Sequence, residues 1–517
     1  MKKINIYKAV TACTFASVLL CSMSSCTDGF QDANRPGTGA SLEDLSRDNY
    51  QTSSFLVQME NEAFPEQENA YQMNEDLIGN YLGRYMTYAN NGFAEKNFAR
   101  LNAPNGWVRY PFKDSMTKTV SAFKAIDNVT KGEGPVYAWA LILRAQSFMR
   151  LTDMYGPLPI GADATDGNAY SSQEDVYKSI IADLNKATDV IKPLVASNPN
   201  VTIAEELDKV YQGKMAKWLK YANSLKLRIA IRIRYVEPTL AKQLGEQAVQ
   251  DGVITSNDDN CAIAYTPNGQ YKTSVEWGDS RACADLESFL TGYNDPRLTK
   301  FFKPTEEAGS RSIIGCRAAA KIGNKTTAGK AYSAANIKID SKGVWLTASE
   351  MAFCRAEGVL AGWSNMGGSA KDLYEDGVKL SFEQWGAGSA TAYLADNTST
   401  EKNYVDPISE YGGDVSAVSN ITIKWDDSAT DEQKMERLIT QKWIAMFPNG
   451  QEGWSEIRRT GYPKVFPLAQ STDYSIQVAN RIPFDIDEAT NNKANYIKAV
   501  QLLKGNDDYA TKMWWQR

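Results

Sequence analysis

Aromatic side chains among polar, loop-forming residues are the best candidates for ligand chemistry in this sequence. The segment Asn102–Tyr110 (NAPNGWVRY) places Trp107, Arg109 and Tyr110 in such a setting. A flat aromatic ring stacks on the C–H face of a sugar, while Arg, Asn and Asp hold hydroxyl groups by hydrogen bonds. An indole in this surrounding is poorly suited to a core, so we expect a ligand-binding loop here, with Trp107 as its main contact.

A second aromatic group lies further along the chain, in a stretch rich in Gly, Ser, Thr and Asn. Tyr271 and Trp277 occur there close to Asn268 and Asp279. Long irregular segments carry binding residues more often than the elements that they connect. Tyr271 and Trp277 are therefore the second candidates for ligand contact.

The absence of histidine restricts the enzyme classes open to this chain. It excludes Ser-His-Asp and Cys-His catalysis and every zinc site with a His ligand. A hydrolase that uses two carboxylates stays possible, because it needs only Asp and Glu. Glu350 and Glu357 fall on similar faces of one predicted helix, but solvated or paired structural acids explain them better. The sequence thus predicts no catalytic residue, no metal site and no cofactor.

The charged residues indicate a role in ion pairs within the protein rather than in binding nucleic acid. The net charge is −6, and no long basic stripe is present to bind phosphates. Arg458 and Arg459 lie close to Glu452 and Glu456 in the sequence. Because guanidinium groups pair well with carboxylates at packed sites, these four residues predict an ion-pair network.

The N-terminus has the pattern of an export signal. Two lysines precede a largely apolar run, Ala9–Met23, which is too short for a comfortable membrane span. Two serines then precede Cys26, as at a lipoprotein cleavage site, and an ordinary secretory signal with an incidental cysteine is the alternative. We expect a signal peptide at 1–25, lipidation of Cys26, a flexible tether at 26–41 and a single domain at 42–517.

Four cysteines follow Cys26, and an exported compartment permits disulfides between them. Cys354 lies in the apolar pattern of a predicted helix, which is typical of a small buried thiol. The sequence therefore leaves open whether Cys261, Cys283, Cys316 and Cys354 form any bridge.

Most of the remaining chain has the pattern of helices with one apolar face. Pro135 and Gly156 mark the two ends of one helix. A capping box, Ser171 with Glu174, starts the next helix. Apolar residues at helical spacing predict further helices at 214–235, 349–361, 370–385 and 431–447. The pattern indicates a mostly α fold of stacked helical hairpins, interrupted by long irregular excursions at 255–345 and 386–430.

Short motifs occur in a fixed order along nearly the whole mature chain. They are Leu143–Ala145 with Tyr155–Pro159, Asp208–Gly213 with Trp218–Arg228, Asp295–Leu298, Ala356–Gly358, Gln441–Trp443, Trp454–Pro463, Arg481–Pro483 and Asn491–Asn492. In this order they resemble the motifs of the SusD/RagB family of nutrient-binding outer-membrane lipoproteins, specifically its SusD-like branch. Phe484-Asp485 departs from the Tyr-Pro that the family usually has at that point.

The resemblance implies a single, mostly α-helical domain built on tetratricopeptide-like helix pairs, with a lipid anchor in the outer membrane and the body facing the exterior. It implies a SusC-like TonB-dependent transporter as partner. The implied ligand is an oligosaccharide, or a peptide in some members, which is bound without hydrolysis and delivered to the transporter. A carboxylate-dependent surface glycoside hydrolase and an adhesion protein are the alternatives from other classes.

Overall fold

The frame of the protein is a row of helices in which each packs against the next. The computed structural model describes residues 50–160, 169–306, 311–469 and 476–517, so the predicted signal peptide, Cys26 and the tether lie outside the described residues. Residues 52–517 form one compact unit. Within the described ranges, none of the helices is both long enough and apolar enough to cross a membrane.

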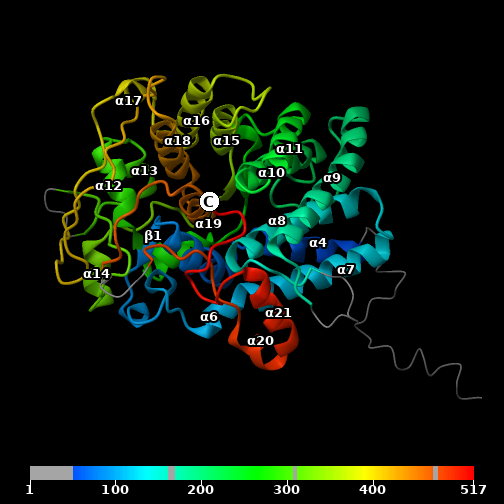
Figure 1. Ribbon diagram of the computed structural model, residues 1–517, viewed down its shortest axis with the longest axis horizontal. Helices are drawn as coiled ribbons and strands as arrows, with labels where there is room; N and C mark the ends of the chain where they lie inside the picture. The colour runs from blue at the N-terminus through cyan, green and yellow to red at the C-terminus, as the bar shows by residue number, and fades with distance from the viewer. Residues whose placement is uncertain (1–49, 161–168, 307–310, 470–475) are drawn as a thin grey trace, which may run out of the picture. The chain divides into compact units, whose positions relative to one another are not determined.

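Contacts between neighbouring helices define the order of this row. α8 lies between α7 and α9, α10 joins α9, α11 and α15, and α15 packs on α16 and α18 (Figure 1). This arrangement confirms the mostly α fold of helical hairpins. The helices of the frame are α7 (Thr117–Thr130), α8 (Gly134–Tyr155), α9 (Gln173–Ser197), α10 (Met215–Ile233), α11 (Pro238–Asp251), α15 (Ala348–Leu360), α16 (Ala370–Gln384), α18 (Asp431–Met446) and α19 (Gly450–Thr460).

The ends of these helices follow from local sequence. α8 begins next to Pro135 and ends at Gly156, whose φ of 87° is the left-handed region that glycine enters without strain. The predicted cap of α9 was wrong by one residue: Ser172, not Ser171, accepts the N–H of Asp175 at 3.1 Å. Ser171 and Ser172 each carry a hydroxyl group able to cap the helix, and the backbone conformation determines which of them does so.

Shorter elements surround the frame, and two small antiparallel sheets pair β1 with β3 and β2 with β4. The stretch 255–345 was predicted to be irregular, but it contains several of these shorter elements. The stretch 386–430 holds α17 and is otherwise irregular. The shorter elements are α4 (Tyr50–Ala63), α5 (Glu68–Tyr71), η2 (Gln72–Asn80), β1 (Met86–Tyr88), η3 (Asn91–Phe93), η4 (Phe98–Arg100), α6 (Asn105–Tyr110), η5 (Pro111–Met116), η7 (Asn257–Asp259), β2 (Cys261–Ile263), η8 (Tyr271–Glu276), β3 (Ser280–Ala282), α12 (Ala284–Gly292), α13 (Leu298–Phe301), α14 (Lys325–Ala331), β4 (Gly343–Leu346), α17 (Thr391–Ala395), α20 (Ile486–Asn491) and α21 (Lys493–Leu503).

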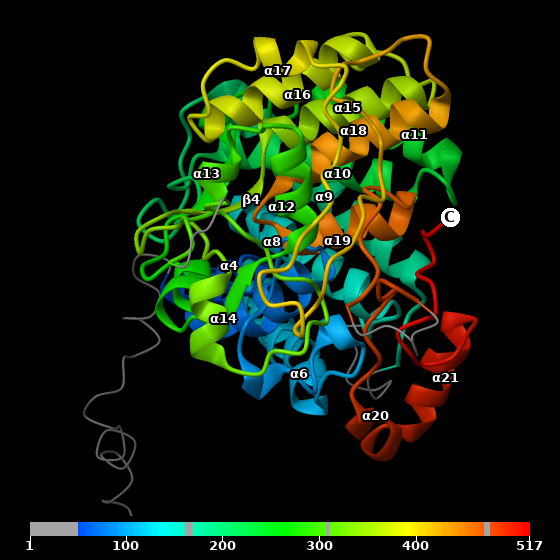
Figure 2. The same ribbon diagram turned by 90° about the vertical axis from the view of Figure 1, so that its left-hand side faces the viewer.

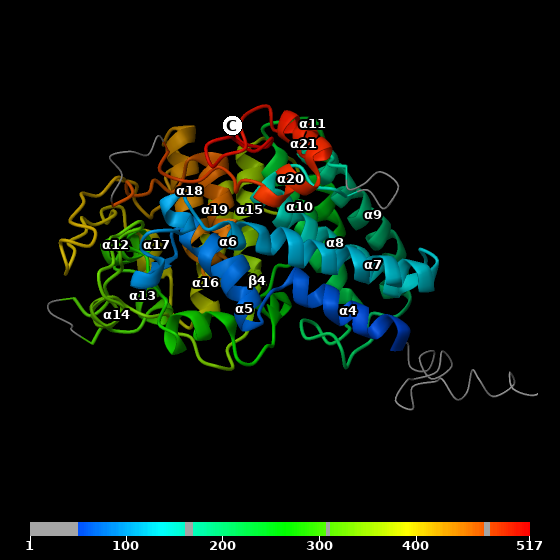
Figure 3. The ribbon, with the colours of Figure 1, turned by 90° about the horizontal axis from the view of Figure 1, so that it is seen from below.

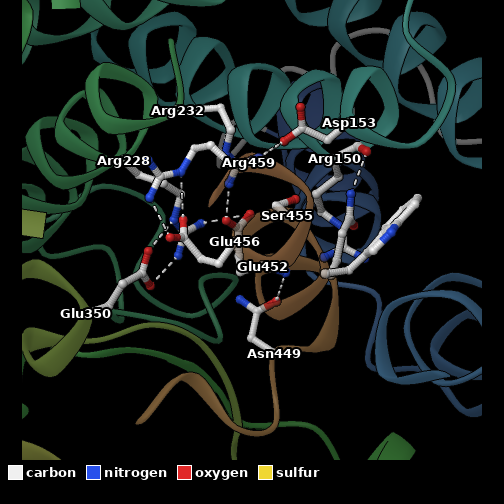
Figure 4. A network of polar contacts seen from close by, with 12 residues as sticks. Arg150, Asp153, Arg228, Arg232, Glu350, Asn449, Glu452, Ser455, Glu456 and Arg459 are labelled. Carbon is white, nitrogen blue, oxygen red and sulfur yellow. Dashed lines mark hydrogen bonds and ion pairs between the residues drawn. The ribbon is translucent and has the colours of Figure 1, made fainter. Parts of the chain in front are cut away.

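Buried charges from four helices pair at the centre of the frame (Figure 4). Arg228 of α10 donates to both carboxylate oxygens of Glu350 on α15, at 2.6 and 2.7 Å. One turn further along α10, Arg232 pairs with Asp153 of α8 and with Glu452 of α19. All five side chains are at most 7% exposed, so each charge depends on its partner rather than on water.

The predicted network at Arg458 and Arg459 is confirmed for Arg459 alone. Arg459 pairs with Glu357 and Glu456, each at 2.6 Å. Arg458 instead donates to the carbonyl of Asp153 at 2.7 Å and stacks 3.4 Å from the ring centre of Trp454. Burial lowers the pKa of Arg458 to about 9, because its guanidinium lies among backbone carbonyls and aromatic rings.

η2 and the segment that follows it pack against α19 at a contact made by glycines. A Cβ on Gly450 would lie 2.3 Å from the backbone nitrogen of Asn80, and one on Gly83 would lie 2.3 Å from the carbonyl oxygen of Gly450. Real Cβ atoms do not come this close to backbone, so both positions require glycine.

We expect Gly450→Ala to lower the free energy of unfolding by about 1–3 kcal/mol, the usual cost of overpacking, because neither backbone can move aside. Urea denaturation measures the loss. Gly106→Ala is the matched control: it is also helical, and its Cβ would meet nothing within 4 Å. Equal stability of the two variants would contradict the close contact.

The four cysteines after Cys26 are free thiols in the structure. All are buried, including Cys354 on α15 as expected. Cys283 and Cys316 lie on paired backbone segments, but their sulfurs are not bonded. Burial raises the pKa of both of these thiols, so they stay protonated and unreactive.

Candidate functional site

Trp107 lies on a short helix, α6, rather than in the loop that its neighbours predicted. Pro104 presets the backbone before the first turn, and α6 continues through η5 into α7. The indole is half-buried: Phe93 meets it edge-on at 5.0 Å between ring centres, and Phe98 stacks on it at 6.5 Å. The ring is therefore held in a fixed orientation at the surface of the core.

Arg109 and Tyr110, predicted to act with Trp107, contact other parts of the chain. Arg109 Nη1 lies 2.9 Å from Asp487 Oδ2 on α20. Tyr110 is half-buried near Lys118, and burial raises its pKa. Residues two apart on a helix do not face each other, which explains why Arg109 is directed away from the indole. Both residues remain candidates, but the described contacts give Arg109 a role in holding α6 against α20.

The second predicted group lies on and just after η8. Tyr271 is half-buried and packs against the core. Trp277 is also half-buried, and Lys272 Nζ lies 5.4 Å from the centre of its ring. Lys272 is fixed in turn by Glu68 at 3.0 Å. This cation–π contact positions the indole of Trp277.

Asp279 connects the loop after β1 with the segment around Trp277. One of its oxygens accepts hydrogen bonds from Asn90 at 2.8 Å and from Lys325 of α14 at 2.6 Å. The other accepts from Gln72 of η2 at 3.2 Å. Pairing of β1 with β3 places Tyr88 opposite Ser280 and so brings Asn90 and Asp279 together. This carboxylate therefore fixes the positions of groups from three separate segments.

Two π-helical segments contribute side chains to this region, and a third follows α6 along the chain. η2 supplies Gln72 to Asp279, η8 supplies Lys272 to Trp277, and η5 follows directly after the helix of Trp107. π-helices are rare and occur often at functional sites, because their extra residue per turn redirects side chains. The contributions of η2 and η8 therefore mark this surface as a candidate site.

We define a candidate ligand face, called the ligand face below, as Asn90, Phe93, Trp107, Trp277 and Lys325. Asn90 and Lys325 bind Asp279, Trp277 lies two residues before Asp279, and Phe93 packs against Trp107. The ligand face combines partly exposed aromatic rings with amide and charged groups, the combination that binds sugars. Figures 1 and 2 place α6 and α14 at the end of the molecule opposite α16 and α17. Figure 3, the view from that end, shows both helices toward the viewer.

Three residues of the ligand face were not predicted. Asn90 and Phe93 follow a strand of three residues that is too short to be recognised by alternation, and Lys325 lies on a helix of seven. The Asn and Gly content of 90–92 was the one available signal, since such residues mark loops.

Asp76, which lies directly behind this surface, is expected to make stability depend on pH. It is fully buried and accepts the Ser280 hydroxyl at 2.5 Å. Burial, reinforced by the charge of Asp279, raises its pKa from 3.8 to about 7. The unfolded chain releases this proton near pH 4 and the folded chain only near pH 7. Stability contributed by the protonated form is therefore lost as pH rises through that window.

Asp76→Asn should accordingly reduce the fall in melting temperature between pH 5 and pH 7.5. The amide keeps the hydrogen bond from Ser280 and has no proton to lose. Thermal unfolding of both proteins at the two pH values measures the difference. The exposed Asp340→Asn serves as control, and an unchanged pH dependence in Asp76→Asn would contradict the assignment.

The carboxylates that could suggest hydrolysis are engaged in structure. Glu350 is held by Arg228, and Glu357 by Arg234 and Arg459. Among the described residues there is no cluster of three or more acidic or cysteine side chains that could hold a metal ion. The predicted interpretation of Glu350 and Glu357 as paired structural acids is thus confirmed.

Comparison with known proteins identifies the architecture. The chain matches the family model described as SusD-like, "Susd and RagB outer membrane lipoprotein", over residues 32–516. A SusD-like protein from Bacteroides thetaiotaomicron VPI-5482 is 36% identical, with a TM-score of 0.84 over 90% of this chain and 98% of that one. A SusD homolog from Bacteroides uniformis ATCC 8492 is 35% identical, with a TM-score of 0.84 over 91% of this chain and 100% of that one.

A chitin-binding SusD homolog from Flavobacterium johnsoniae is 35% identical, with a TM-score of 0.83 over 90% of this chain and 98% of that one. No curated protein matches the chain. The fold is thus that of a mostly helical, SusD-like protein. The chain belongs to the SusD-like family of outer membrane lipoproteins, as its motifs predicted.

Proposed function

We propose that this protein binds oligosaccharides at the ligand face and delivers them to a SusC-like TonB-dependent transporter in the outer membrane. The observation that carries the proposal is the arrangement around Asp279, where half-buried indoles lie beside amide and charged groups on a rigid support. Membership of the SusD-like family, and the chitin-binding homolog within it, support a nutrient ligand. Lipidation at Cys26 would hold the protein at the outer membrane, with its body toward the exterior.

Binding without catalysis fits the chemistry of the site. The one carboxylate at the centre of the ligand face, Asp279, is occupied by Asn90, Gln72 and Lys325. A glycoside hydrolase needs a second carboxyl group across the scissile bond, about 5–9 Å away. We therefore propose that the ligand leaves unchanged and that no cofactor takes part.

Isothermal titration of the purified protein against a panel of oligosaccharides and peptides tests this function. The panel includes chito-oligosaccharides, because a homolog binds chitin. We expect heat of binding with at least one oligosaccharide and no new product by chromatography after prolonged incubation. Binding of peptides alone would overturn the sugar assignment, and product formation would overturn the capture mechanism.

A further inference from the structure

A narrow crevice beside β4 lies apart from the ligand face as defined above. Glu66, Tyr71, Gln270, Trp345 and Trp385 line it, and the exposed Lys342 lies at its edge. Its volume is about 30 Å³. A single water needs about 10–15 Å³ on this measure, so the crevice accommodates a group of about two heavy atoms but not a sugar ring.

Polar atoms without a protein partner are concentrated around this crevice. Both polar side-chain atoms of Gln270 and the indole nitrogen of Trp385 have no hydrogen-bond partner among the described residues, whereas the carboxyl group of Glu66 interacts with the indole N–H of Trp345. Gln270, Glu66 and Trp345 are at most 3% exposed. Buried polar atoms are nearly always paired with protein or water, so three such atoms on residues that line one crevice mark a place for a small polar group.

The mixture of donors and acceptors selects the chemistry of that ligand. The N–H groups of Gln270 and Trp385 would repel a metal ion or an ammonium group. The acceptor oxygen of Gln270 would repel an anion. A hydroxyl group both donates and accepts, and therefore satisfies both sets.

The charges around the crevice agree with a neutral ligand. Burial raises the pKa of Glu66 to about 8, so its carboxyl group carries a proton at neutral pH. Glu75, which also lines the crevice, is paired with Arg150 at 3.1 Å. The rings of Tyr71, Trp345 and Trp385 supply apolar walls against which a CH₂ group can pack.

Gly343 keeps the carboxyl group of Glu66 at the wall of the crevice. A Cβ at this position would lie 1.8 Å from Glu66 Oε1, too close for the two atoms to coexist. Any larger residue at 343 would therefore displace the carboxyl group of Glu66 and change the crevice.

We propose that this crevice binds the hydroxymethyl arm of a neutral sugar, with the ring outside beside Trp385. A hydroxymethyl group has two heavy atoms, one of which packs against the aromatic walls while the other joins the unpaired polar atoms. The site is distinct from the ligand face and does not depend on the function proposed for it.

Two sugars that differ only in this arm provide the test. Methyl β-D-glucopyranoside has a hydroxymethyl group and methyl β-D-xylopyranoside lacks it. Ligand-observed NMR titration should show that the glucoside binds the full protein about fivefold more tightly or better, the effect expected for one or two net hydrogen bonds. The preference should disappear in Gln270→Leu, which removes unpaired atoms and so leaves stability almost unchanged.

Variants at other places separate the possible causes. Gly343→Ala should also abolish the preference, whereas Gln243→Leu, which lines a different hollow, and Trp277→Ala should retain it. Equal binding of the two sugars, or a preference lost in Trp277→Ala and kept in Gln270→Leu, would overturn the proposal. Failure of oligosaccharide binding at the ligand face would leave this preference intact, so the two proposals fail separately.

Discussion

Replacing Arg228 by methionine is expected to lower the free energy of unfolding by about 3–5 kcal/mol, the cost of leaving one member of a buried ion pair alone. Arg228 makes both hydrogen bonds to the carboxylate of Glu350, and a third to the carbonyl of Trp345 at 2.9 Å. Both charged side chains are 3% exposed. Methionine fills a similar volume but leaves the carboxylate of Glu350 without its partner or water. Urea denaturation followed by circular dichroism measures the loss.

Two further variants test the cause of this effect. Arg517→Met breaks a pair with Glu432 whose side chains are 63% and 60% exposed, and should cost less than about 1 kcal/mol. Adding Glu350→Gln to Arg228→Met removes the stranded charge and should restore part of the stability. Equal stability of Arg228→Met and Arg517→Met would contradict the argument that the buried Arg228–Glu350 pair stabilises the protein more than the exposed pair does.

Replacing Trp277 by alanine is expected to weaken oligosaccharide binding about 10- to 30-fold, as truncation of an aromatic hot spot does. The indole is fixed by Lys272 at 5.4 Å and lies two residues before Asp279, so it offers a preset stacking surface. Isothermal titration with the best oligosaccharide of the panel gives the change in dissociation constant.

The controls for Trp277→Ala distinguish stacking from damage to the fold. Trp277→Phe keeps a ring and should retain most of the affinity. Tyr235→Ala removes an aromatic ring of similar burial at the end of α10 and should leave binding unchanged. Unchanged affinity in Trp277→Ala with loss in Trp107→Ala would place the sugar over α6 and contradict the role given to Trp277.

The helical frame was predictable because its signals are local. Pro135 and Gly156 lie within a residue of the ends of α8, and α10 and α15 match their predicted ranges within two residues. Where two residues offer the same chemistry, as Ser171 and Ser172 do, sequence alone does not choose the cap. The short helix α6 was missed because Pro104 and Gly106 are more typical of loops.

The ligand face was predictable only in part, because its organisation depends on contacts between distant residues. Trp107 and Trp277 could be singled out by composition, and stay predictions until a ligand is tested. The hydrogen bond from Asn90 to Asp279 joins residues that are 189 positions apart in the sequence, and no local pattern around either residue predicts it. The same holds for Arg228 and Glu350, which are 122 apart.

The crossing of η2 and α19 also bears on how the chain reaches its folded state. Trp443 donates to the carbonyl of Gly83, 360 residues away, and Gln451 donates to Glu75, 376 residues away. During synthesis from the N-terminus, the carboxylate of Glu75 on η2 therefore cannot accept its hydrogen bond from Gln451 until α19 has been synthesised. Long-range contacts of this kind slow folding and leave partly folded chains open to aggregation. A chain cut between these segments would not yield two independent halves, but fragments that must associate to become stable.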